Sequence, residues 1–468
     1  MKINRRDFIK KTVTAGVFLG VSPIIKSLTL PSNSYKIVIK NGTVLTDSKW
    51  GNPYIGITNE GKIQLTYKPI LGDIEIDATN KIVSPGFIDI LADNSANPNI
   101  TYSIFEKYKL TDGVTTALQM HGGYHKVSEY YNDFKNKKHY TNYGISTKVM
   151  NVRNSISSLS GRYKAVEKCL NEGALGVSHS IEYQPTPYSE LLEYAKLAKK
   201  YSRPLFLHLR YSSKEKEIEG VIEAINIAKD TGVHVHIDHL NSTGGTFNMP
   251  KALELISSAR ESGHSLTTCV YPYSYWATYL HSKRYGEGWR ERYNLDYNDL
   301  VIVGTGERLT KSSFYNYRKG YGRLAAVPEG TMPFDETVDL ALQHDFCMIG
   351  SDGGIESSSK ANNHPRGAGC FSTAVNHALK IGLPLEKIIE KITTLPQSLI
   401  AGAMPLRGKI ANNYIADITI FDKDKINGTA TIANPNQFSD GIDTVIVNGE
   451  IAYQNKNLIA KNGMPIRY

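Results

Sequence analysis

The sequence predicts an α/β protein whose central part is a (β/α)8, TIM-like barrel and whose two ends together form a small β-sandwich. Two observations lead to this prediction. The middle of the chain alternates short apolar runs with amphipathic helical patterns, which is typical of parallel barrels. Both ends instead alternate apolar and polar residues between glycine-containing turns, which favours antiparallel sheet.

The β-sandwich is assigned to residues 35–81 and 403–468. The first part contains YKIVIKNGTVL and YIGIT, and the second contains ADITIFD and DTVIVNGE. Because two β-rich ends flank one long middle of a different pattern, we expect the two ends to assemble into one accessory domain.

Eight strands are expected in the barrel, which we assign to residues 82–402. They lie at 82–90, 115–120, 145–152, 174–179, 204–210, 233–239, 265–271 and 347–351. Between them, patterns such as SELLEYAKLAKKY (189–201) repeat apolar residues at spacings of three and four. The segment is longer than the roughly 250 residues typical of the fold. We assign the excess to an insertion at 274–335, a predicted lid at the catalytic end.

Residues 1–34 predict an export signal. The segment NRRDFIK, with Arg5 and Arg6, resembles the twin-arginine signal, and the apolar stretch from Thr12 to Ile25 is too short to span a bilayer. We therefore expect recognition by export machinery and a location in the periplasm or cell envelope. A basic, mobile N-terminus is the alternative.

The net charge of +9 does not indicate a nucleic-acid partner. Residues 1–34 hold six basic residues against Asp7, so +5 belongs to the signal and +4 to the other 434 residues. No basic stripe is found on the predicted mature chain. The four cysteines are far apart with no C-x-x-C pair, so neither a disulfide framework nor a thiolate zinc module is expected.

Polar residues at the carboxyl ends of barrel strands are the candidates for chemistry. His208 closes the fifth strand, His239 closes the sixth, and Asp352 follows the eighth. Two imidazoles on adjacent strands can bind one divalent ion, and a carboxylate across the mouth can ligate it or accept a proton. His234 and His236 alternate with apolar residues in mid-strand, so they are expected to be structural.

Several segments resemble the amidohydrolase superfamily and, more narrowly, the D-aminoacylases (N-acyl-D-amino-acid deacylases). They keep their order and spacing from about residue 35 to the C-terminus: VSPGFIDILAD, GVTTALQMHGG, EGALGVSHSIEYQPTPYSELLEYAK, FLHLR, IDHLNST, CVYPYSYWAT, IGSDGG, HPRGAG and ADITIFD with NGMPIRY. Inside the insertion, VGTGERLTKSSFYNYR further resembles the branch that acts on N-acyl-D-glutamate.

The resemblance implies a zinc-dependent hydrolase of linear amides, with an N-acyl-D-amino acid or a short peptide-like amide as its small-molecule substrate. It implies that Asp352 is the catalytic base and that Arg366 binds the substrate α-carboxylate. It also implies that the Tyr183 hydroxyl polarises the scissile amide and that Tyr271 contacts the carboxylate. The hydroxyl residue expected six positions after Tyr271 is Ala277 here, and Thr278 is a possible substitute.

The chain departs from this pattern at the metal site. Leu91 and Asp93 stand where the superfamily has H-x-H, so one zinc ion is expected rather than two. His121 lies close to the position of the family's bridging cysteine. It is either a replacement ligand, in a metal site of His121, His208, His239 and Asp352, or a structural residue. For Asp93 an oxygen ligand is the alternative to the hydrogen bond that we favour. No lysine is expected at a strand end to bridge two metals.

Two alternative functions follow from the same residues. A cyclic-amide or dipeptide hydrolase keeps the chemistry and changes the substrate. A barrel that lost catalysis together with H-x-H and now only binds a ligand is favoured by Leu91, whereas His208, His239, Asp352 and Arg366 argue against it.

Overall fold

A parallel barrel occupies the middle of the chain, as the sequence predicts. The computed structural model describes residues 35–468 except 47–48, 94, 96, 321 and 356–362, so the predicted signal segment lies outside the described residues. The barrel strands are β8 (Phe87–Asp89), β9 (Val114–Gln119), β10 (Asn142–Ile145), β11 (Thr147–Lys148), β12 (Val177–Ser180), β13 (Leu205–His208), β14 (Val235–Ile237), β15 (Leu266–Val270) and β19 (Cys347–Ile349). They pair in parallel in the orders β10-β9-β8 and β11-β12-β13-β14-β15-β19, so β10 and β11 together fill the third strand position.

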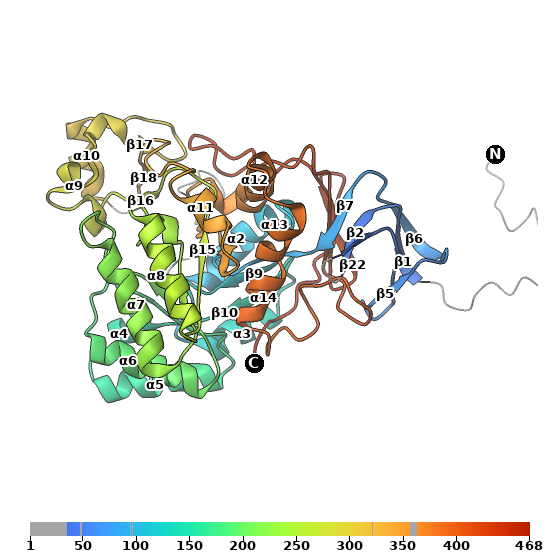
Figure 1. The fold of residues 1–468 in the computed structure, drawn as a ribbon, viewed down its shortest axis with the longest axis horizontal. Helices are drawn as coiled ribbons and strands as arrows, with labels where there is room; N and C mark the ends of the chain where they lie inside the picture. The colour runs from blue at the N-terminus through green and yellow to red at the C-terminus, as the bar shows by residue number, and fades with distance from the viewer. Residues whose placement is uncertain (1–34, 47–48, 94, 96, 321, 356–362) are drawn as a thin grey trace, which may run out of the picture. The chain divides into compact units, whose positions relative to one another are not determined.

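Amphipathic helices cover the barrel (Figure 1). They are α2 (Pro98–Thr111), α3 (Val127–Lys135), α4 (Val149–Ser155), α5 (Leu159–Asn171), α6 (Tyr188–Lys200), α7 (Glu217–Thr231), α8 (Met249–Glu261), α11 (Val338–Leu342), α12 (Arg366–Lys380), α13 (Leu385–Ile392) and α14 (Thr394–Leu399). In α7 the buried Val221, Ala224, Ile225 and Ala228 repeat at spacings of three and four, which places them on one face. The helix ends at Gly232, whose left-handed backbone (φ 65°) lets its N–H reach Ala228 O.

Two of the expected strands differ from the observed ones. The run 145–152 was expected to be one strand, but it contains the end of β10, β11 and most of α4. Its apolar residues Ile145, Val149 and Val152 are spaced by four and three, which fits a helix as well as a buried strand. The run 82–90 is divided at Gly86, where a Cβ atom would lie 2.2 Å from the Thr115 side chain.

Buried polar groups join the first and last barrel strands. Lys109 Nζ lies 2.9 Å from Asp89 Oδ2, and the Ser351 hydroxyl donates to the same oxygen at 2.5 Å. Both charged side chains are 1% exposed or less. Because a buried charge is costly without its partner, this network ties β8 to the chain just after β19.

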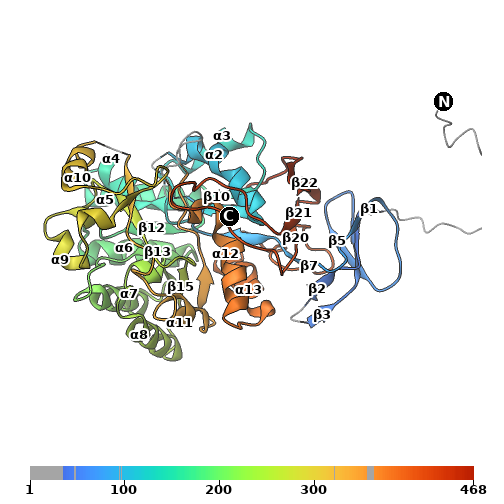
Figure 2. The ribbon, with the colours of Figure 1, turned by 90° about the horizontal axis from the view of Figure 1, so that it is seen from above.

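Strands from both chain ends form the accessory β-domain (Figures 1 and 2). One sheet has the order β5-β4-β1-β6, from β1 (Tyr35–Lys40), β4 (Tyr54–Ile57), β5 (Ile63–Thr66) and β6 (Gly72–Asp77). The other has the order β23-β22-β21-β20-β7-β2-β3, from β2 (Thr43–Thr46), β3 (Lys49–Gly51), β7 (Ile82–Pro85), β20 (Ile418–Phe421), β21 (Ile442–Val447), β22 (Glu450–Gln454) and β23 (Asn457–Leu458). Ile39 and Ile55 from the first part and Ile418 and Ile446 from the second share one buried core.

The insertion after β15 carries its own small sheet. Its elements are β16 (Ala277–Tyr279), η2 (Lys283–Tyr285), α9 (Trp289–Tyr293), η3 (Tyr297–Asp299), β17 (Val301–Ile302), α10 (Lys311–Arg318) and β18 (Leu324–Ala326). The strands pair antiparallel in the order β16-β18-β17, and Trp289 stacks on Phe314 between α9 and α10 (Figure 1).

Among the described residues, no helix is both long enough and apolar enough to cross a bilayer.

Candidate metal centre and active site

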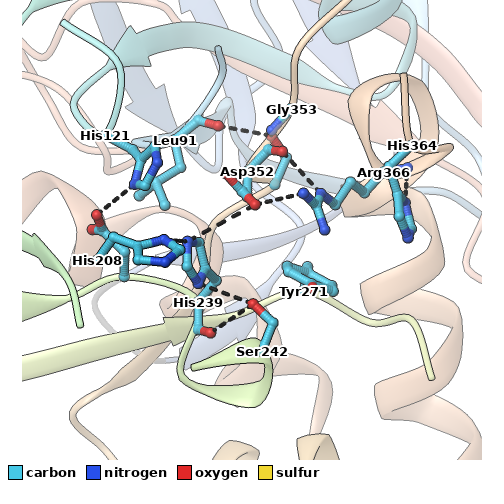
Figure 3. Close-up of polar contacts among 12 residues, drawn as sticks. Leu91, His121, His208, His239, Ser242, Tyr271, Asp352, Gly353, His364 and Arg366 are labelled. Carbon is cyan, nitrogen blue, oxygen red and sulfur yellow. Dashed lines mark hydrogen bonds and ion pairs between the residues drawn. The ribbon is translucent and has the colours of Figure 1, made fainter. Parts of the chain in front are cut away.

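Three histidines converge at the carboxyl ends of the barrel strands (Figure 3). His208 ends β13, while His121 and His239 each come two residues after a strand, β9 and β14. One nitrogen of each ring lies within 4.8 Å of the other two. His208 Nδ1 and His239 Nε2 are 3.2 Å apart, close to the roughly 3.4 Å that separates two nitrogen ligands of a tetrahedral zinc ion.

The second nitrogen of each ring is held by a neighbouring polar group. His121 Nδ1 lies 2.6 Å from Asp238 Oδ2, and His208 Nε2 lies 2.8 Å from Glu182 Oε2. His239 Nδ1 lies 3.0 Å from the Ser242 hydroxyl. These contacts leave His121 Nε2, His208 Nδ1 and His239 Nε2 as the ligand atoms, and such outer partners are what orients histidines at metal sites.

Burial favours the ligand form of two of these rings. It lowers the pKa of His208, and it lowers the pKa of His239 well below the usual value for histidine. Both rings are therefore neutral at neutral pH, which is the form that binds a metal. The chemistry and spacing of the donors fit a divalent ion such as zinc.

Asp352 faces the histidines from the end of the eighth strand. Its Oδ2 lies 3.9 Å from His239 Nε2, and Arg366 binds it from the opposite side through Nη2 at 2.5 Å (Figure 3). Arg366 Nε also donates to Asp352 O at 2.8 Å. Burial alone would raise the pKa of Asp352, but the Arg366 guanidinium beside it holds the pKa well below its usual range. The side chain is thus a carboxylate.

Two of these residues have strained backbones. His239 and Asp352 have φ angles of 29° and 46°, in or near the left-handed region that side-chain-bearing residues rarely adopt. Arg366 holds the Asp352 backbone and side chain together, which stabilises this conformation. Such strain is common where a fold must aim a functional side chain.

A cavity of 580 Å³ opens above this cluster. Its lining contains the cationic residues Lys148, Lys283, Arg284 and Arg366, and Asp352 is its one carboxylate among the described residues. Tyr183 and Tyr271 also line it, as do Ala277 and Thr278. The cavity is therefore suited to an anionic ligand.

The predicted substrate-contacting tyrosines both lie beside the cluster. The Tyr183 ring is centred 4.8 Å from the His208 ring, and burial raises the pKa of its hydroxyl to about 12, so it remains a donor. The Arg366 guanidinium lies 4.3 Å from the centre of the Tyr271 ring.

The structure does not bring Asp93 or Leu91 into the cluster. Asp93 Oδ2 accepts from Gln119, Ser95 and Thr101 at 2.6–2.9 Å, which is the hydrogen-bonded role that we favoured. Leu91 is fully buried in an apolar cluster inside the barrel, beside Cys269. An aliphatic side chain offers no ligand for a second ion.

Sequence reasoning missed four residues of this site. Glu182 and Arg284 are in a loop after a strand and in the insertion, where the pattern does not fix side-chain direction. Asp238 lies inside the expected strand 233–239, but the observed strand β14 ends at Ile237. Lys148 was placed in mid-strand because the third strand was expected to run to residue 152. It ends β11 and lines the cavity, so the expectation of no lysine at a strand end is wrong.

The fold and the site define a class: a (β/α)8 barrel with a histidine metal centre, a carboxylate and a guanidinium at the carboxyl ends of its strands. The amidohydrolase family matches residues 107–452, so the chain belongs to that family.

Curated relatives include two proteins of Alcaligenes xylosoxydans xylosoxydans. The chain is 28% identical to an N-acyl-D-glutamate deacylase over 301 residues, which cover 60% of the chain and 58% of the relative. It is 26% identical to a D-aminoacylase over 311 residues, which cover 62% and 60%. The matches thus span less than two thirds of each relative. A crystal structure of N-acyl-D-glutamate deacylase from Bordetella bronchiseptica, in complex with zinc and a phosphonate inhibitor, shares the fold, with a TM-score of 0.77 at 22% identity over 93% of this chain and all of the other.

The contact between Asp238 and His121 leads to a prediction about metal affinity. Asp238→Asn removes the acceptor charge that orients His121, so zinc should bind about 10- to 100-fold more weakly. Competition with a chromophoric chelator measures the affinity. Asp339→Asn is the matched control, because Asp339 accepts from His377 at 2.5 Å and neither residue lines the cavity. Equal zinc affinities in the two variants would contradict this prediction. They would show either that His121 binds zinc without support from Asp238 or that His121 does not bind zinc.

Proposed function

We propose that the protein is a zinc-dependent amide hydrolase that acts on N-acyl-D-amino acids, with an N-acyl-D-glutamate-like substrate as the preferred class. The observation that carries the proposal is the placement of His121, His208 and His239 opposite Asp352 and Arg366 around one cavity. The D configuration is proposed by analogy with the deacylases named above.

The side chains of the site divide the work of amide hydrolysis. A zinc ion held by the three histidines would activate a water and attract the amide carbonyl. Asp352 is ionised and can accept a proton from the attacking water and then pass it to the leaving amine. The Tyr183 hydroxyl can donate to the carbonyl oxygen as negative charge develops on it.

Arg366 is suited to the α-carboxylate of the substrate. A guanidinium can donate two parallel hydrogen bonds to a carboxylate, and this one lies between Asp352 and Tyr271 at the cavity wall. In the described structure it donates to Asp352. Substrate binding would redirect part of this hydrogen bonding and release Asp352 for proton transfer.

The charge of the cavity supports an acidic substrate. Arg284 is a buried guanidinium contributed by the insertion, and Lys148 and Lys283 also line the cavity. A substrate with two carboxylates would then meet separate cations. Arg366 would bind one carboxylate, and the part of the cavity lined by Arg284 would bind the other. The sequence resemblance of VGTGERLTKSSFYNYR to the N-acyl-D-glutamate branch points the same way.

One zinc ion per chain is part of the proposal. Leu91 has no ligand atom, and the Asp93 carboxylate is occupied by three side-chain donors. A second ion beside the first would therefore lack the ligands that H-x-H provides elsewhere in the superfamily.

The test is a zinc-dependent assay with a substrate panel. We expect zinc-free protein to be inactive and zinc to restore hydrolysis of N-acetyl-D-glutamate, with lower kcat/KM for N-acetyl-D-leucine. Asp352→Asn should lower kcat about 10²- to 10⁴-fold because it removes the base. The His208→Ala, His239→Ala double variant should lose both zinc and activity.

Three outcomes would contradict the proposal. Full activity in the double variant would exclude the metal centre, and preference for a cyclic amide or a dipeptide would change the substrate class. A zinc-loaded protein that binds N-acetyl-D-glutamate without turnover would favour the ligand-binding barrel.

We also propose that the protein is exported to the periplasm or cell envelope. The support is the NRRDFIK segment followed by the apolar stretch 12–25. Cell fractionation should find the protein outside the cytoplasm, and Arg5→Lys with Arg6→Lys should retain it inside. Export that persists in this double variant would contradict a twin-arginine signal.

A further inference from the structure

Glu182 contacts both the metal centre and the insertion. Its Oε2 lies 2.8 Å from His208 Nε2 and 3.3 Å from Arg284 Nε, so one oxygen accepts from a candidate ligand and from a residue of η2. Its Oε1 accepts from the Ser212 hydroxyl. All three partners are buried, and Glu182 itself is 13% exposed.

The insertion reaches this carboxylate through two elements. Arg284 comes from η2, and besides Glu182 it binds Ser242 O through Nη2 at 2.8 Å. Ser242 is the residue whose hydroxyl contacts His239 Nδ1. Tyr293, at the end of α9, places its hydroxyl 3.3 Å from the Ser212 hydroxyl. The insertion thus contacts Glu182 and Ser242, the residues that orient the candidate ligands His208 and His239.

We propose that Glu182 is a positioning residue that couples metal binding to the docking of the insertion over the cavity. This inference rests on the proposed metal site, because it takes His208 as a ligand. In the metal-loaded protein the insertion is ordered and presents Arg284 to the cavity. In the metal-free protein the backbone amides of the insertion are less protected from hydrogen exchange.

The coupling follows from the two nitrogens of His208. A metal at Nδ1 fixes the proton on Nε2, so the ring always donates to Glu182. The carboxylate is then oriented with the same oxygen towards Arg284. Without the metal, the neutral ring can also carry its proton on Nδ1, and the contact with Glu182 is no longer enforced.

The Arg284 pair makes the coupling strong enough to measure. A buried guanidinium that loses its carboxylate is left uncompensated in a poorly solvated position, which is costly. By reciprocity, whatever metal binding adds to docking, docking adds to metal affinity. Because Arg284 also lines the cavity, the binding site for the substrate side chain is complete only in the metal-loaded protein.

The experiment is hydrogen–deuterium exchange on the full chain, with and without zinc, read at residues 283–293. In the wild type we expect zinc to slow exchange in this segment at least about 10-fold. In Glu182→Gln the effect of zinc on this segment should vanish, and zinc affinity should fall about 10- to 100-fold. Exchange is measured at saturating zinc for each variant, so weaker binding does not mimic lost coupling.

Glu223→Gln is the matched control. Glu223 forms a partly buried ion pair with Arg210, which lies two residues after His208. Glu223 itself contacts none of the three candidate ligands. This variant should behave as the wild type. Far-UV circular dichroism checks folding. If Glu182→Gln does not fold, Glu182→Asp shortens the side chain by one methylene and should likewise abolish the effect of zinc on exchange at residues 283–293.

Zinc protection of 283–293 that persists in the Glu182 variants would overturn the coupling, and so would a wild type that binds zinc with no change in this segment. A wild type that binds no zinc at all would instead contradict the proposed metal centre. The two failures are therefore distinguishable.

Discussion

Three buried imidazoles can share one metal ion only if they are neutral and each turns one nitrogen towards the other two. Their convergence at the barrel mouth therefore depends on partners that fix each ring from behind. Glu182 does this from the loop after β12, and Asp238 and Ser242 do it from the segment after β14. The rest of the site is arranged around the nitrogens that remain, with Asp352 and Arg366 opposite. The buried network of Asp89, Lys109 and Ser351 supports this arrangement, because it links the first strand to the chain that carries Asp352.

Neither position that the superfamily pattern fills with a histidine offers a free ligand atom to the cluster. Leu91 packs with Cys269 inside the barrel, and Asp93 is turned into a hydrogen-bonded network with Gln119 and Thr101. His121 lies with His208 and His239, and its Nδ1 contacts Asp238. Under the proposal of one zinc ion, the three histidines and their hydrogen-bond partners form its ligand set. A one-ion centre is the proposal that accommodates both the absence of H-x-H and the presence of Asp352 and Arg366.

The fold could be predicted because strand and helix periodicities differ and the barrel repeats them. The convergence of His208, His239 and Asp352 could be predicted because the ends of parallel strands meet at one face of the barrel. The third strand was misjudged because Ile145, Val149 and Val152 satisfy both periods, and Lys148 was lost with it. Glu182 and Arg284 could not be found from the sequence, because their meeting depends on how an insertion folds back over the loops after β12 and β13. Glu182 directly precedes Tyr183 in the EYQP segment, but nothing in that motif shows which of the two side chains supports a ligand.

Anomalous diffraction at the zinc absorption edge tests the account most directly. Crystals of the zinc-loaded protein should show one peak per chain, within bonding distance of His121 Nε2, His208 Nδ1 and His239 Nε2, about 2.0–2.1 Å from each. A second peak beside Leu91 and Asp93, or a single peak without His121, would contradict a three-histidine centre that holds one ion.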